Sequence, residues 1–201
     1  MSAHEQLEHA EHVEHASQTN KRIALLISVL ALFLALSEVL GKNSQTHAIT
    51  YNVNANDLWA FYQAKHVRQT VLNTAAEQMQ LEVDRATDPA VKERLTKTID
   101  GWKKTIAHYD NEPSTNEGRK QLSARAKEAE HQRDEALARY HNYEFASAAF
   151  QIGIVLASAT IITGMMVLAW LSGVLGLAGL AFTAFGLWAP HALDFLTHAS
   201  H

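Results

Sequence analysis

Apolar and polar positions divide this chain into stretches of very different character. Residues 145–190 contain no Asp, Glu, Lys or Arg. One helix needs only about 20 residues to cross a hydrocarbon core roughly 30 Å thick, so this run is long enough for two. It predicts membrane-spanning helices at residues 146–171 and 174–193, joined by a tight turn at Ser172-Gly173.

Another apolar run lies near the N-terminus. Ile23–Leu40 follows the basic pair Lys21-Arg22 and predicts a membrane-spanning helix at residues 21–41. A signal peptide also begins with basic and apolar residues, but here an acidic segment precedes the basic pair and no Ala-x-Ala-like site follows the run. We therefore interpret the segment as a retained anchor helix.

The polar stretch at residues 42–145 is periodic through most of its length. Residues 41–56 are ambiguous, because asparagines and β-branched residues weaken a helix. Asp57–Ala86 places apolar residues at steps of three and four, which predicts a helix with one apolar stripe. The stripe comprises Ala60, Ala64, Val67, Val71, Ala75, Met79 and Val83, and the remaining surface carries Lys65, Arg68, Glu77, Glu82 and Arg85.

Two further helices are predicted in this stretch. Asp88-Pro89 is a strong helix start, and Asn111-Glu112-Pro113 ends the amphipathic pattern that follows. Ser114 with Glu117 has the form of a capping box, so a third helix is expected to begin there and to continue into the second span.

These elements predict an all-α integral membrane protein with three transmembrane helices. An antiparallel helical bundle at residues 42–145, of coiled-coil type, forms a protruding stalk. Residues 1–20 form a flexible His/Glu-rich tail, because few large apolar side chains are present to offset the entropy of ordering it. Residues 194–201 form a C-terminal tail.

Charge and cysteine content narrow the possible functions. The net charge of −4 offers no clustered positive field for nucleic acid. The absence of cysteine excludes disulfides, thiolate catalysis and cysteine-ligated metal centres. More basic residues flank the stalk ends of the spans than the N-terminal end, which favours a cytoplasmic stalk. They are Lys42, Arg125, Lys127, Arg133 and Arg139, against Lys21 and Arg22.

Two sequence stretches resemble a known family. LSEVLGKNSQTHAI, beginning at Leu36, and NDLWAFYQAKHVRQT, beginning at Asn56, are similar to a bacterial family of small membrane proteins called domain of unknown function 4337. The resemblance extends to the His/Glu-rich leader, the early span, the helical middle and the C-terminal hairpin. It implies an integral membrane protein of bacterial type, and it implies no reaction, cofactor or site. We expect a multi-pass protein of the bacterial inner membrane.

Four polar residues are candidates for a role at membrane depth. Glu38 lies near the end of the first span, where a carboxylate either reaches the interface or handles protons or ions. Gln151 lies inside the second span, where helix packing is favoured over a pore lining. His191 and Asp194 follow the third span, and a cap at the interface is the default interpretation.

Small residues spaced by four are typical of close helix packing in membranes. The positions singled out are Ala149, Gly153, Ala157, Gly164 and Gly179. Some of these contacts are expected within one chain. Three spans cannot cover one another fully, so we expect part of the stripe to contact another subunit.

His9, His12 and His15 could hold a divalent ion, since imidazole suits zinc, nickel or copper. A solvated tail without a rigid frame is the favoured alternative. Trp and Tyr residues of the stalk have the spacing of helix cores rather than of a ligand cage.

No nucleotide-binding glycine loop or Gly-x-Ser-x-Gly motif is present. We therefore expect a non-enzymatic membrane scaffold without a cofactor. It would form a homo-oligomer in the lipid bilayer and present the stalk to a partner protein. The alternatives are a small ion or proton channel or transporter subunit that uses Glu38, and a metal-responsive membrane protein that uses the N-terminal histidines.

Overall fold

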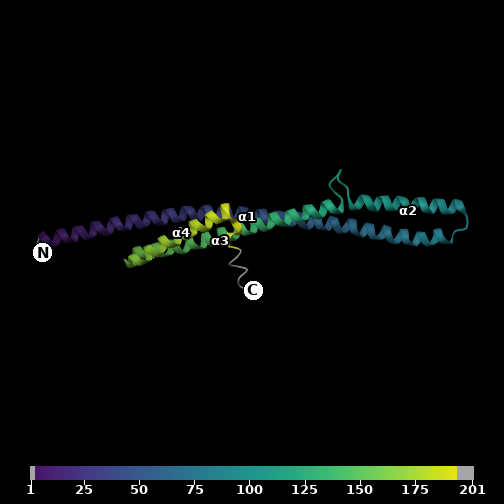
Figure 1. Cartoon of the computed structure of the whole chain (residues 1–201). Coiled ribbons are helices and arrows are strands. Elements are labelled where there is room, and N and C mark those ends of the chain that lie inside the picture. The colour runs from purple at the N-terminus through teal and green to yellow at the C-terminus, as the bar shows by residue number, and fades with distance from the viewer. Residues whose placement is uncertain (1–2, 194–201) are drawn as a thin grey trace. The chain divides into compact units, whose positions relative to one another are not determined.

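The computed structural model describes residues 3–193, with side chains from Asn20 to Ala192, and all regular structure in this part is helical (Figure 1). The elements are α1 (Ala3–Arg85), α2 (Pro89–Asp110), α3 (Arg119–Thr163), α4 (Met166–Trp188) and the 3₁₀ helix η1 (Pro190–Leu193). The predicted all-α class is confirmed. The chain forms two compact units: unit 1 is Met1–Ala48 with Asp134–His201, and unit 2 is Ile49–Arg133.

Helix α1 is continuous through segments that the sequence left open or assigned to a tail. Residues 41–56 are helical throughout, and the expected flexible tail is helical from Ala3 onward. The first proline of the chain is Pro89, so nothing before it removes a backbone donor from the helix. The side chains before Asn20 lie outside those that the structure describes.

In unit 1, α1, α3 and α4 pack side by side around one apolar cluster (Figure 1). Leu30 of α1 meets Ala146 and Phe150 of α3, and all three are buried. The partly buried residues around this cluster are Leu26, Phe33, Leu34, Ile154 and Phe182. Because dense packing of this kind gains dispersion contacts, it holds helices together even where water is absent.

The turn between the last two long helices differs from the prediction. It lies at Gly164-Met165, and Ser172-Gly173 is inside α4. Gly164 has a φ of 72°, a left-handed conformation that favours glycine. Ser172 is fully buried, and its hydroxyl donates to the carbonyl oxygen of Gly153 at 2.8 Å, so this polar residue serves helix packing. The predicted boundaries of both spans, at 171 and 174, are therefore wrong.

In unit 2, the start of α2 agrees with the prediction. The Asp88 side chain accepts from the amide of Ala90 at 2.9 Å, and Pro89 occupies the first turn. The predicted start of the third helix at Ser114 is wrong, because α3 begins at Arg119. Asn116 has a φ of 61°, and a Cβ on Gly118 would collide with the backbone of Glu112.

The core of unit 2 has two parts along α1. One joins α1 to α3 and contains Ala55, Leu58, Leu122, Ala126 and Ala129, with Trp59 and Tyr62 packed against it. The other joins α1 to α2 and contains Ala76, Val83 and Ile99, with Met79, Leu95 and Trp102 packed against it. These aromatic residues pack on the core, as their spacing predicted.

The apolar stripe predicted for α1 is only partly the buried face. Its N-terminal half is exposed, including Val67 at 60% and Val71 at 62%, together with Ala60 and Ala64. The buried face of this segment instead includes Lys65, expected on the polar surface.

Candidate functional site

The apolar stretches of the three helices in unit 1 are aligned in space. A Cβ on Gly153 or on Gly176 would come within 3.3 Å or 2.7 Å of Leu30, so these residues share one level across the three helices. A second shared level contains Gly41, Tyr143 and Gly186, because a Cβ on either glycine would come within 3.3 Å of the Tyr143 side chain.

Charged residues lie at both ends of this aligned layer. Lys42 and Glu144 directly follow Gly41 and Tyr143, while Arg22 lies at the far end of the layer in α1. The Arg22-to-Lys42 separation is 20 residues, or about 30 Å at 1.5 Å per residue. That length matches the thickness of a bilayer core.

Within this layer, every helix of unit 1 exposes large apolar side chains. Three examples are Leu25 on α1 at 66% exposed, Ile162 on α3 at 85% and Trp170 on α4 at 76%. Such a surface is unfavourable in water and favourable in lipid. Three helices, within Asn20–Arg85, Arg119–Thr163 and Met166–Trp188, are long and apolar enough to cross a membrane.

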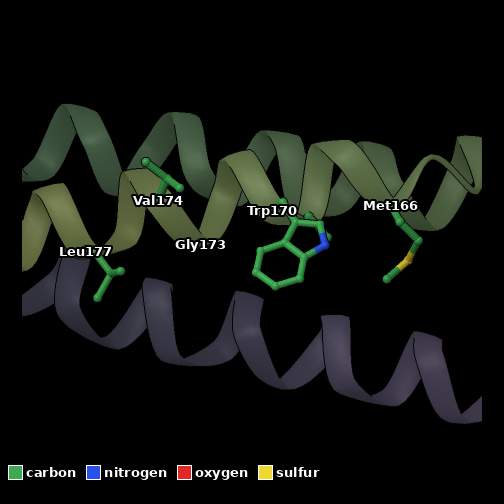
Figure 2. Close-up of a pocket in the computed structure, with 6 residues that line it drawn as sticks. Met166, Trp170, Gly173, Val174 and Leu177 are labelled. Atoms are coloured by element: carbon green, nitrogen blue, oxygen red, sulfur yellow. The ribbon is translucent and has the colours of Figure 1, made fainter.

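Helix α4 carries a shallow apolar groove on its exposed surface. Figure 2 shows that Met166, Trp170 and Leu177 project from one side of the helix, and that Gly173 lies between Trp170 and Leu177. A Cβ on Gly173 would meet nothing within 4 Å, so this glycine leaves open space.

The two polar candidates on α1 and α3 lie together. Gln151 donates from Nε2 to Oε1 of Glu38 at 3.4 Å, across α1 and α3, and both side chains are exposed. Glu38 lies one helical turn, about 6 Å, inside Lys42. The sequence indicated each residue as a candidate by itself, and the structure brings the two side chains into contact.

Other polar groups of this layer bond within the unit. The Ser37 and Thr183 hydroxyls are 3.1 Å apart, and the Ser158 and Thr160 hydroxyls donate to carbonyl oxygens one turn earlier. Such bonds satisfy the hydroxyl groups within the helices, and the Ser37–Thr183 contact adds specificity to helix packing.

The small-residue candidates pack within the chain. Ala149, Gly153 and Ala157 are buried in unit 1, and a Cβ on Gly179 would come within 2.7 Å of the Phe150 ring. The expected subunit contact through these residues is therefore replaced by contacts inside one copy. Gly164 is a turn residue, so its predicted role in helix packing is wrong.

The histidine candidates are only partly described. His191 is exposed in η1, while Asp194 lies outside the described residues. His9, His12 and His15 belong to α1, but their side chains also lie outside what is described. From Asn20 to Ala192, no group of three or more metal-ligating side chains is arranged to hold an ion. The metal-binding hypothesis stays a prediction.

Unit 2 contains a polar cluster that sequence reasoning missed, where α2 ends against α1. Lys65 is 5% exposed, and its Nζ lies 3.3 Å from Oε2 of Glu112. His108 Nε2 lies 3.0 Å from the other carboxylate oxygen. The Lys65 ammonium also lies 5.1 Å from the Phe61 ring and 5.8 Å from the Tyr109 ring, distances at which aromatic faces attract a cation.

Arg119, the first residue of α3, completes this cluster. Its guanidinium donates to the Gln69 side chain and to the Tyr62 hydroxyl, and it lies 4.8 Å from the Tyr62 ring. Gln69 donates in turn to the carbonyl oxygen of Ile106 at 2.8 Å. The cluster therefore ties α1, the end of α2 and the start of α3 together, which is a structural role.

The groups around Glu112 lower the pKa of its carboxyl. Burial by itself raises the pKa of the Glu112 carboxyl. Hydrogen bonds from Thr115 and Lys65, together with the positive charges of His108 and Lys65, outweigh burial and hold the pKa below its ordinary value. The carboxylate is thus ionised at neutral pH, as an ion pair with Lys65 requires.

These features define an all-helical protein in which three helices are long and apolar enough to span a membrane. The family described as Domain of unknown function (DUF4337) matches residues 19–189. The chain belongs to this family, so the resemblance seen from Leu36 and from Asn56 onward is confirmed. Among curated proteins and solved structures, nothing matches the chain.

Proposed function

We propose that this protein is a non-enzymatic membrane scaffold that acts as a homo-oligomer. Unit 1 anchors it in a lipid bilayer, and unit 2 lies in water and presents its helices to a partner protein. The observation that carries the proposal is the aligned layer of unit 1, whose outer surface is apolar and in which Glu38 is the one charged residue between Arg22 and Lys42. A layer about 30 Å thick with such a surface has lipid as its matching solvent.

Membrane extraction tests the anchor. The full chain should stay in the membrane pellet after washing at high pH and should enter solution only with detergent. Recovery of folded protein in the supernatant without detergent would overturn the proposal. A control with a known peripheral protein shows that the wash removes proteins that merely adhere to the membrane.

We further propose that the membrane is a bacterial inner membrane and that unit 2 faces the cytoplasm. The excess of basic residues on that side supports this orientation. The chain has no native cysteine, so an Asp100→Cys variant carries one thiol on the exposed surface of α2. A membrane-impermeant thiol reagent should label it in lysed cells only. Labelling in intact cells would reverse the orientation.

A second candidate function is proton or cation transfer through Glu38. The contact with Gln151 favours it, because the pair places a carboxylate and an amide together on an otherwise apolar surface. Purified protein in liposomes should then give a proton or cation flux that Glu38→Gln reduces. No flux from the unmodified protein would remove this candidate and leave the scaffold proposal intact.

A further inference from the structure

Helix α1 has two apolar faces in unit 2, and only one of them is covered. The covered face includes Leu58, Ala76 and Val83, which pack on α3 and α2. The uncovered face, which we call the α1 seam, carries large side chains that are 53% to 62% exposed. The seam consists of Ile49, Val53, Ala60, Ala64, Val67, Val71 and Leu81.

The spacing of the seam is that of a coiled coil. From Ala60 the positions advance by four, three and four residues to Val71, and the same alternation continues through Thr74 and Gln78 to Leu81. Such a repeat keeps one narrow stripe facing a neighbouring helix. Leu58 and Val67 are nine residues apart, or about 180° around a helix, so the seam lies opposite the covered face.

Neither water nor lipid suits the composition of the seam. Five exposed large apolar residues along one face of a water-facing helix would form a patch of the kind that marks an interaction site. Lipid is not the matching solvent, because charged residues flank the stripe on both sides, among them Arg68 and Glu77. A helix from another chain, apolar along one stripe only, matches both observations.

We propose that the α1 seam binds the α1 seam of a second copy of this chain, parallel and in register. This inference rests on the proposed membrane anchor, because copies inserted with one orientation present α1 in the same direction. Each seam residue then faces its own counterpart, as a two-fold symmetric contact requires. The positions of the heptad repeat that face the partner helix, called a and d, would then contain small and β-branched residues, Ala64 and Val71 among them.

The size of the seam fits a contact that depends on the membrane. From Ile49 to Leu81 the helix rises about 48 Å, and a stripe about 10 Å wide gives roughly 500 Å² per copy. Two copies would bury about 1,000 Å², which is near the lower bound for a specific interface. Confinement of both copies to one bilayer raises their effective concentration and favours such a contact.

Cysteine cross-linking of the full-length protein in membranes tests the inference. Single cysteines are placed at Ala60, Ala64, Val67 and Val71, and at the exposed off-seam controls His66 and Asn73. A disulfide needs Cα atoms within about 7 Å. Mild oxidation should therefore give a covalent dimer several-fold more often at each seam position than at either control. Equal cross-linking at all six positions, or none at the seam, would overturn the proposal.

A second pair of variants separates this inference from the proposed anchor. Val67→Glu should reduce cross-linking through Ala64→Cys several-fold, whereas Asn73→Glu should leave it unchanged. Both variants should stay in the washed membrane pellet. Retention in the pellet without seam cross-linking would refute the seam contact alone, while loss of the unmodified protein from the pellet would refute the anchor.

Discussion

Unit 1 and unit 2 share helix α1, yet their exposed apolar residues are distributed differently. In unit 1 such residues occur on the outer surface of all three helices, as Leu32, Ile152 and Trp188 show. In unit 2 they concentrate on α1, along the face opposite its packed side. Exposure on every helix is typical of a surrounding apolar solvent and supports the proposed anchor, whereas exposure on one stripe supports the proposed contact with a single partner helix.

The largest expected effect comes from a charge placed at matched positions of the two units. Leu32 and Val67 are both 60% exposed on α1. Leu32→Arg puts a cation in the layer, which costs about 2.5 to 3.5 kcal/mol on scales from membrane-insertion experiments. It should greatly reduce membrane integration, scored as protein in the washed pellet, whereas Val67→Arg should integrate normally. Equal integration of both variants would contradict the difference in solvent.

The next effect separates the two faces of unit 2. Leu122 is fully buried against the α1 core, while Val71 lies on the seam. Leu122→Ala should lower the free energy of unfolding by about 2 to 5 kcal/mol because it leaves a cavity. Val71→Ala should change that free energy by less than about 0.5 kcal/mol in the isolated copy. Thermal unfolding in detergent at low protein concentration measures both, and a large loss for Val71→Ala would show that the seam is covered within one chain.

A smaller effect probes packing within unit 1. A Cβ on Gly179 would come within 2.7 Å of the Phe150 ring, whereas one on Gly173 meets open space. Gly179→Ala should therefore lower stability by about 1 to 3 kcal/mol through overpacking. Gly173→Ala should be neutral or slightly stabilising, since alanine favours helix. Resistance to stepwise denaturation in mixed micelles compares the two, and equal behaviour would argue against this packing.

The smallest expected effect is the acid response of the polar cluster in unit 2. The pKa of Glu112 is lower in the folded state than its ordinary value of 4.5. Its stabilisation is therefore complete above pH 4.5 and is lost as the pH falls through the folded-state pKa. Glu112→Gln should flatten this part of the stability curve, while Glu117→Gln, an exposed control, should not. Thermal unfolding at stepped pH measures the slopes.

The sequence predicted some of these elements well. Asp88-Pro89 marks the start of α2 because capping and proline geometry are local effects. The long uncharged run predicted two C-terminal helices long and apolar enough to cross a membrane for a similar reason, since length and composition are local properties. Local chemistry was sufficient in both cases.

Other elements depend on contacts that no local pattern reveals. Gly164 and Gly173 both lie in the uncharged run, so composition does not choose between them as the turn. In the structure Ser172 packs on Gly153 inside α4, and Gly164 takes the left-handed turn conformation. Lys65 looks like a surface residue until Glu112 is brought beside it. Periodicity therefore could not reveal that the apolar half-stripe of α1 was the outer face. The Glu38–Gln151 contact joins residues 113 positions apart and was likewise out of reach.

The short link between α3 and α4 has a consequence for biogenesis. Only Gly164 and Met165 separate the two helices, and neither carries a charge. Insertion of α3 and α4 into a bilayer would therefore move no charged loop across it, because the connection between these helices carries no charge. In the proposed anchor, the two helices would enter the bilayer together as a hairpin. The charged residues that precede this hairpin in α3 would decide on which side of the bilayer its two open ends lie.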